Sequence, residues 1–295
     1  MFNFFRVLFS PIIAILDFIT KYFKTIVFLT IIYFIVDSSS ENMDSNSFEV
    51  ANLQKIELLG PILDVTKTLD EISEAKKNPN IKGVLFHVNS PGGAVAPSVE
   101  LAYAIKELKE LKPVVVYASG VMASGSYYAS IWANEIIVNP GSMVGSIGVI
   151  MQGVNAQELL DKIGISTQTV KAGKYKESGT PTRKWFDYEE EQLKSVINDT
   201  YDMFITDVAN ARNLKKEDHT KFADARIFTA SQSKQVGLID KVATVSYAKD
   251  RLVELSEVQI PVWKKQDKFD KFLDRVISQT ASKVSVYFNS DLKAY

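Results

Sequence analysis

The stretch IKGVLFHVNSPGG, residues 81–93, decides the fold expected for this chain. Its first eight residues are mostly apolar, and Pro91, Gly92 and Gly93 then form a turn, as at the end of a buried strand. In the following segment, apolar residues recur three positions apart, which predicts a helix with one buried face: Val99, Ala102, Ile105 and Leu108. A second apolar run extends from Pro113 to Tyr117. Strand, helix and strand in this order predict a parallel β-α-β unit.

The same alternation continues on both sides of this unit. Asp187 with Glu190 resembles an N-terminal capping box and predicts the start of a long helix. Other helices are predicted over residues 65–77 and 156–163, and extended segments over 48–59, 135–138, 145–151 and 166–170. We therefore expect an α/β domain with a mostly parallel sheet and flanking helices over residues 48–255.

Residues 1–37 are expected to form a membrane anchor. Phe, Ile, Leu and Val dominate this segment. Its uninterrupted apolar run, Thr25 to Val36, spans only about 18 Å as a helix, so the spanning helix is expected to start near Tyr22 or earlier. Lys and Arg precede the run, and none follows before Lys55, so the positive-inside rule places the N-terminus in the cytoplasm. Residues 38–47, rich in Ser, Asn and Asp, are predicted to link the anchor to a domain on the opposite side of the membrane.

The composition excludes several kinds of site and partner. A net charge of −1 argues against broad attraction to nucleic acid. The absence of cysteine excludes disulfides, thiolate nucleophiles and Cys-ligated zinc. The two histidines are too few for a His-rich metal site. His87 lies in an apolar run and His219 in a charged stretch, so we expect both to be structural, and we expect neither a metal nor a cofactor.

The turn MASGSYY, residues 122–128, contains a candidate nucleophile. Ser124 lies between small residues at the expected start of a helix, where its hydroxyl would be accessible. The amides of Gly93 and Gly125 could both point at an oxygen that gains negative charge during acyl transfer. From the residues alone, five other serines compete for the same role: Ser119, Ser126, Ser130, Ser142 and Ser146.

The basic loop KAGKYKESGTP, residues 171–181, could supply the base. A lysine accepts a proton from serine only when burial or a neighbouring cation lowers its pKa from the usual value of about 10.4. A solvated surface loop is the alternative interpretation of Lys171, Lys174 and Lys176.

Four motifs in order resemble the signal peptide peptidase A family of bacterial membrane serine proteases. They are NSPGG from Asn89, ASGxYY from Ala123, GSIGV from Gly145, and KxGxxKxxxxP from Lys171. The resemblance covers residues 48–255 and includes two later segments, ARIFTA at 225–230 and GLID at 237–240. The second glycine that is usual in the ASGGYY motif is Ser126 here, which could narrow the pocket.

The resemblance implies a fold of the ClpP and crotonase type, in which Ser124 is the nucleophile and Lys176 the general base. It further implies that Ser146 forms a hydrogen bond with the lysine and that Gly93 and Gly125 form the oxyanion hole. The expected protein is a single-pass endopeptidase of the bacterial inner membrane, with its catalytic domain on the extracytoplasmic side. Its expected partners are apolar peptides left from signal peptides, membrane lipid and further copies of the chain. Cleavage of other membrane proteins and a non-catalytic membrane scaffold are the alternatives.

Residues 256–295 are treated as a C-terminal extension. Helical spacing is expected around Phe269 to Ile277, and a short strand around Lys283 to Phe288. We expect the stretch from Trp263 to Tyr295 to pack against a neighbouring subunit or to lie near the catalytic groove, and a frayed terminus is the alternative.

Overall fold

The computed structural model describes residues 17, 18, 20–30, 32, 33 and 50–265. The chain divides into two compact units, Met1–Glu49 and Val50–Tyr295. In the first unit the described residues are helical. None of the helices among the described residues combines the length and the apolar character needed to cross a membrane. Much of the predicted anchor and most of the C-terminal extension lie outside the described residues.

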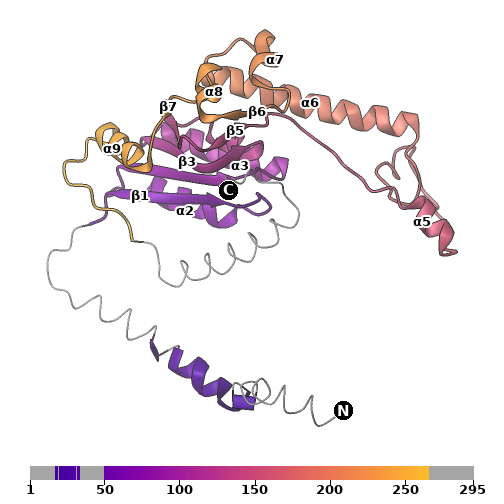
Figure 1. The fold of residues 1–295 in the computed structure, drawn as a ribbon, viewed down its shortest axis with the longest axis horizontal. Helices are drawn as coiled ribbons and strands as arrows, with labels where there is room; N and C mark the ends of the chain where they lie inside the picture. The colour runs from indigo at the N-terminus through magenta and orange to yellow at the C-terminus, as the bar shows by residue number, and fades with distance from the viewer. Residues whose placement is uncertain (1–16, 19, 31, 34–49, 266–295) are drawn as a thin grey trace. The chain divides into compact units, whose positions relative to one another are not determined.

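In the second unit, strands alternate with helices, as the sequence predicts (Figure 1). The strands are β1 (Leu53–Leu59), β2 (Gly83–Ser90), β3 (Val114–Ala123), β4 (Glu135–Val138), β5 (Met143–Gly145), β6 (Ile227–Thr229) and β7 (Lys241–Val242). The helices are α2 (Thr66–Lys77), α3 (Val95–Lys109), α4 (Gly125–Ser130), α5 (Gln157–Lys162), α6 (Asp187–Arg212), the 3-10 helix η2 (Lys216–Asp218), α7 (His219–Phe222), α8 (Ala230–Gln235) and α9 (Val245–Leu255).

One seven-stranded sheet forms the centre of this unit, in the order β1-β2-β3-β4-β7. These five strands are parallel, whereas β5 pairs with the end of β3 in parallel and with β6 in antiparallel fashion. The predicted α/β class with a mostly parallel sheet is therefore confirmed. Strand β3 pairs with β4 along its first half and with β5 along its last residues. Directly after this second pairing the chain turns into α4.

The two faces of the sheet are covered differently. Alternate residues of the central strands, such as Phe86 and Val116, face a large core that also contains buried residues of α2, α3, α4 and α6. On the opposite face, Leu85 and Val115 belong to a smaller core with Ala248 and Leu252 of α9. Helix α9 therefore covers only part of this second face.

Two local predictions are wrong. Residues 166–170 do not form a strand but lie in an exposed segment between α5 and α6, where the structure shows no sheet partner for them. Helix α6 does begin at Asp187, but Glu189 rather than Glu190 caps it, because its carboxylate accepts a hydrogen bond from the amide of Phe186 at 2.9 Å.

The first residues of the C-terminal extension continue the edge of the sheet. Trp263 forms a parallel bridge with Leu53, and the amide of Lys264 donates to the Leu53 carbonyl at 2.7 Å. The predicted helix and strand beyond residue 265 lie outside the described residues.

Candidate active site

Ser124 lies at the sharp turn between β3 and α4, in a strained backbone conformation. Its φ of 53° and ψ of −124° are unusual for a residue with a side chain. The Ser124 amide donates to the Gly145 carbonyl at 2.8 Å, and the Ser124 carbonyl accepts from the Tyr128 amide at 3.0 Å. Such strain costs on the order of 1–3 kcal/mol and is concentrated at functional sites. The surrounding hydrogen bonds hold the serine at the tip of the turn, as in other strand-to-helix nucleophile turns.

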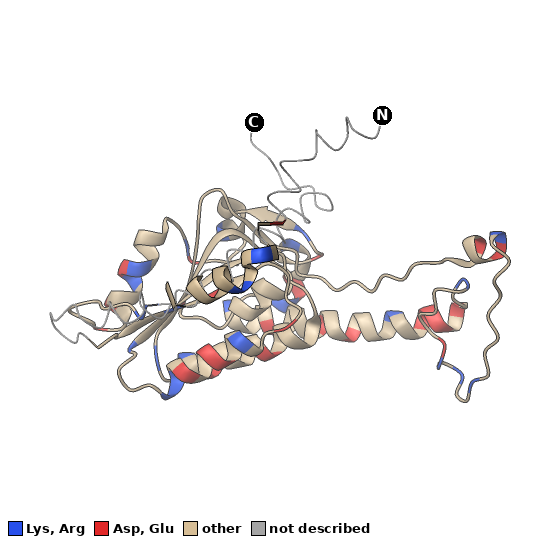
Figure 2. Cartoon of the chain, turned by 90° about the horizontal axis from the view of Figure 1, so that it is seen from below, with Lys and Arg blue, Asp and Glu red and all other residues tan. Residues whose placement is uncertain are grey.

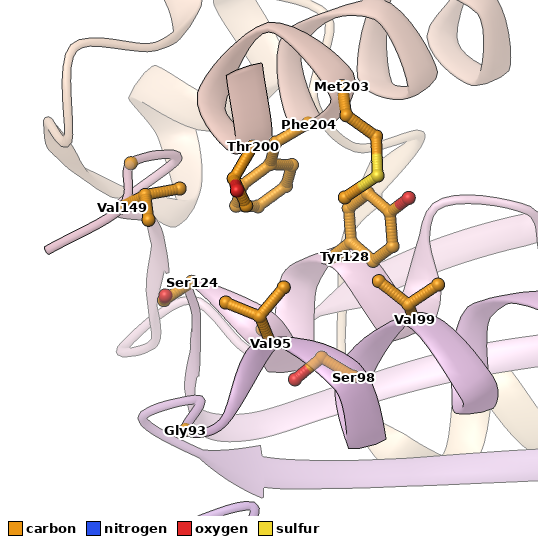
Figure 3. A pocket seen from close by; sticks show the side chains of 12 residues that line it. Gly93, Val95, Ser98, Val99, Ser124, Tyr128, Val149, Thr200, Met203 and Phe204 are labelled. Atoms are coloured by element: carbon orange, nitrogen blue, oxygen red, sulfur yellow. The ribbon is translucent and has the colours of Figure 1, made fainter. Parts of the chain in front are cut away.

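An apolar pocket opens beside Ser124 (Figure 3). Its walls come from the start of α3, from α4, from the residues after β5 and from one face of α6. The lining side chains are mostly apolar: Val95, Val99, Tyr128, Val149, Met203 and Phe204, with Ser98 and Thr200. A site of this composition suits an apolar side chain of a substrate.

The backbone nitrogens of Gly93 and Gly125 lie close together next to Ser124. The backbone of Ile62 pairs with the residues on both sides of Gly93: its amide donates to the Gly92 carbonyl, and its carbonyl accepts from the Ala94 amide. The amide of Gly93 therefore points away from Ile62. The amide of Gly125 is in the first turn of α4, where no carbonyl of the same helix can accept it. The Gly93 nitrogen lies 3.5 Å from the position that a Cβ on Gly125 would occupy. Both predicted oxyanion-hole residues line the pocket.

The competing serines are held in other environments. The Ser126 hydroxyl is fully buried, accepts from the Ala123 amide at 2.9 Å and lies 2.7 Å from the Ser90 carbonyl. It is not among the pocket-lining residues, so the substitution for the family's glycine does not narrow the pocket. Ser130 and Ser142 are also buried and donate to backbone carbonyls. Ser119 lies on the other face of the sheet, in contact with His87.

Tyr128 is fixed in the wall of the pocket from two sides. Its hydroxyl donates to the carboxylate of Asp207, and its ring meets that of Phe204 edge to face at 4.8 Å. Burial, followed by the hydrogen bond to Asp207, raises the pKa of Tyr128 well above its usual range. The tyrosine therefore acts as a neutral, oriented part of the wall.

Lys176 lies on an extension that we call the arm, residues 149–186. Figures 1 and 2 show the arm running out from the sheet to the N-terminal end of α6. Lys176 is exposed there. Its neighbour Tyr175 contacts Tyr188 in the first turn of α6, with 5.6 Å between ring centroids, and Lys174 lies over the same ring at 4.5 Å.

An ion-pair network, which we call the clamp, fastens this loop to α6. The Arg183 guanidinium donates to both carboxylate oxygens of Glu189, at 2.8 and 2.9 Å, and to Glu177 at 3.0 Å. Lys171 also donates to Glu177, at 2.9 Å. The hydrogen bonds from Lys171 and Arg183 lower the pKa of Glu177 to about 2, and those from Arg183 lower the pKa of Glu189 to about 2. The clamp therefore holds the residue next to Lys176 in place.

One chain does not bring Ser124 and Lys176 together. Thr200, in the wall of the Ser124 pocket, lies twelve residues after Tyr188, about 18 Å along the α6 axis. Lys176 is not among the pocket-lining residues. Ser146 directly follows Gly145, the partner of the Ser124 amide, and no hydrogen bond joins its side chain to Lys176 in the described residues.

Sequence reasoning missed the contribution of α6 to the pocket and the clamp on the arm. The spacing of Thr200, Met203 and Phe204 places them on one helical face, but nothing in that pattern shows that the face borders Ser124. The sequence indicates the clamp only weakly. The charged residues around Lys176 predict a basic loop, but they do not show which of them form ion pairs.

Comparisons with known proteins show the family to which the chain belongs. The sequence pattern of peptidase family S49 matches residues 106–259. A protein of Methanocaldococcus jannaschii named as a protease is 41% identical over 198 residues, covering 67% of this chain and 64% of that protein. A protein of Enterococcus faecium named as a signal peptide peptidase is 33% identical over 190 residues, covering 64% of this chain and 54% of that protein.

Among solved structures, a mutant of the 1510-N membrane-bound stomatin-specific protease superposes with a TM-score of 0.49 at 16% identity, covering 73% of this chain and 98% of that one. The matched part of the chain spans between about half and two thirds of the length of the two sequence relatives. The family match covers more than half of the chain and includes Ser124, Ser146 and Lys176. The chain therefore belongs to peptidase family S49.

Proposed function

We propose that this protein is a serine endopeptidase in which Ser124 is the nucleophile. The single observation that carries the proposal is the strained Ser124 turn, with the backbone nitrogens of Gly93 and Gly125 beside it in the wall of an apolar pocket. This arrangement meets the geometric needs of acyl transfer: an accessible hydroxyl, two donors for the oxyanion and a site for the substrate side chain.

The general base in this proposal is Lys176 of a neighbouring copy of the chain. Its own arm is fastened to the first turn of α6 by Arg183 and Glu189, too far from the pocket for a hydrogen bond to Ser124 of the same chain. Large apolar side chains are exposed along the arm: Ile150, Val154, Leu159, Ile163, Ile165 and Val170. Exposed apolar surface of this kind marks protein contacts, which favours a homo-oligomer in which one arm reaches the next copy.

Docking of the arm would exclude water from the Lys176 amine, and burial favours the neutral form of a lysine. The neutral amine then takes the Ser124 proton as the hydroxyl attacks the peptide carbonyl. The Gly93 and Gly125 amides hold the oxyanion, and the lysine returns the proton to the leaving amine. Water, activated by the same lysine, hydrolyses the acyl-enzyme. Ser146 directly follows Gly145, whose carbonyl accepts from the Ser124 amide, so it is suited to orient the incoming lysine.

The proposed substrates are apolar peptides released in the membrane, including cleaved signal peptides. The apolar pocket supports this proposal, as does the name of the Enterococcus faecium relative. The apolar composition of residues 1–37 supports anchoring to the bacterial inner membrane with the catalytic domain outside the cytoplasm. An anchored domain would meet these peptides at high local concentration.

Substitution of the two reacting residues tests the proposal. Ser124→Ala and Lys176→Arg should each lower kcat for a fluorogenic apolar peptide by several orders of magnitude, because the first removes the nucleophile and the second keeps the charge but cannot accept a proton. Lys174→Arg is the matched control and should retain most activity. An active Lys176→Arg enzyme would exclude the general-base role.

A further inference from the structure

A second set of polar side chains lies on the opposite face of the sheet from the Ser124 pocket. Glu57 of β1 is paired in register with His87 of β2, and His87 with Tyr117 of β3, two residues before Ser119. These residues continue the rows of Leu53, Leu85 and Val115, which α9 covers. Helix α9 leaves the ends of the rows accessible: Ser119 is exposed, and the His87 and Glu57 side chains are 23% and 22% exposed.

The three side chains are joined in the order of a catalytic triad. His87 Nε2 lies 2.8 Å from Ser119 Oγ, and His87 Nδ1 lies 3.0 Å from Glu57 Oε1. A carboxylate can only accept a hydrogen bond, so Nδ1 carries the proton and Nε2 is left to accept the Ser119 proton. Glu57 also accepts from Lys55 at 2.8 Å. The histidine therefore has the tautomer and the partner of a general base.

The surroundings fix the orientation of these groups. The His87 ring stacks on that of Tyr117, with 5.8 Å between centroids. The pairing of β2 with β3 shifts register between Val88 and Ser90, so Ser119 lies in an irregular part of β3. Such bulges occur next to active sites, where they redirect a side chain.

Asn89, on the same strand as His87, carries a side-chain donor that suits an oxyanion. Its Oδ1 accepts from the Val121 amide at 2.9 Å, which orients the side-chain amide so that Nδ2 is its donor. The Asn89 side chain borders Gly120, where an added Cβ would lie 2.6 Å from Oδ1. Asn89 is exposed, and its in-register neighbour Leu59 offers an exposed apolar surface. Asparagine side chains act in this way in other hydrolytic sites.

We propose that Ser119, His87 and Glu57 form a second hydrolytic site, for small carboxylic esters with short acyl groups. His87 Nε2 takes the Ser119 proton while Oγ forms a bond to the acyl carbon. The ester C–O bond then breaks, and the alcohol leaves with that proton. Water splits the acyl-serine, which releases the carboxylic acid and restores Ser119. The open position of Ser119 suits small esters, which need no enclosed pocket, better than peptides.

The test uses the full-length Ser124→Ala protein in detergent, so that the first site cannot act. With p-nitrophenyl acetate, adding Ser119→Ala should lower the hydrolysis rate at least tenfold, and adding His87→Asn should do the same. A fluorophosphonate probe, mapped by mass spectrometry, should label Ser119 only when His87 is present. His219→Asn and Ser231→Ala are the matched controls and should change neither readout.

Ser119→Ala removes one oxygen from an exposed side chain, so it should leave the fold intact even if His87→Asn does not. Equal ester hydrolysis with and without Ser119, or a lack of probe on Ser119, would overturn the proposal. The peptidase activity of the single variant Ser119→Ala should equal that of the wild type. The two sites are therefore tested separately, and failure of one leaves the other standing.

Discussion

Two serines of the ASGSYY turn, two residues apart, have opposite roles. Ser124 is held in a strained, accessible position, whereas the Ser126 hydroxyl is buried between the Ala123 amide and the Ser90 carbonyl. We expect Ser126→Ala to lower the free energy of unfolding by about 1–3 kcal/mol, because it leaves a buried amide without its partner. Urea unfolding measures this loss, and peptidase activity below the transition should persist. An inactive Ser126→Ala together with an active Ser124→Ala would reverse the assignment of the nucleophile.

Gly125 is required because of its contact with α3. A Cβ at this position would lie 2.1 Å from Ser98 Oγ, which is itself held by the Ala94 carbonyl. Gly125→Ala should therefore shift the oxyanion amide and lower kcat by at least a hundredfold. The double variant Gly125→Ala with Ser98→Gly removes the clash and should recover part of the activity. Without any recovery, the loss would not come from this contact.

At the scale of elements, the clamp makes the arm sensitive to acid. The pKa values of Glu177 and Glu189 are lowered to about 2, so the two ionised carboxylates stabilise the folded arm above the ordinary carboxyl pKa, near 4.5. This stabilisation should fall as the pH drops from about 4.5 to 2. The protection of the amides of residues 171–189 against hydrogen exchange, relative to their intrinsic exchange rates at each pH, should fall over that range.

The variant Arg183→Ala isolates the clamp. It should make amide hydrogen exchange in the arm fast already at neutral pH. It should also lower kcat, because the clamp holds Glu177, the residue next to Lys176, in place. Arg183→Lys is the matched control of charge: it keeps one cation but loses the bidentate contact with Glu189, so intermediate exchange is expected. Unchanged exchange and kcat in Arg183→Ala would show that the clamp does not position the arm.

Helix α6 connects the pocket to the arm, and its inner face should set specificity. Met203 contributes a flexible side chain to the pocket wall beside Phe204. Met203→Ala should raise kcat/KM for peptides with a bulky apolar residue at the cleavage site relative to those with alanine. A set of fluorogenic peptides that differ only at this residue measures the ratio. An unchanged ratio would mean that the substrate side chain binds elsewhere.

The sequence predicts the helices and strands better than it predicts which of their residues come into contact. The sequence runs 81–93 and 113–117 identify the two central strands, and the small residues of 122–128 identify the Ser124 turn, because burial and turn chemistry are local properties. The failed strand at 166–170 had suitable residues, but no sheet edge lies beside it. The position of Lys176 depends on Arg183 and Glu189, and the pairing of His87 with Ser119 depends on strand register. Neither follows from local pattern.

At the scale of the whole molecule, the central claim is that Ser124 and Lys176 act together across two copies. Full-length Ser124→Ala and Lys176→Ala proteins, each inactive alone, should regain activity when they are co-expressed and co-purified through different tags. Random head-to-tail contacts between equal amounts should restore about a quarter of the wild-type rate. A mixed assembly of verified composition that remains inactive would contradict the claim.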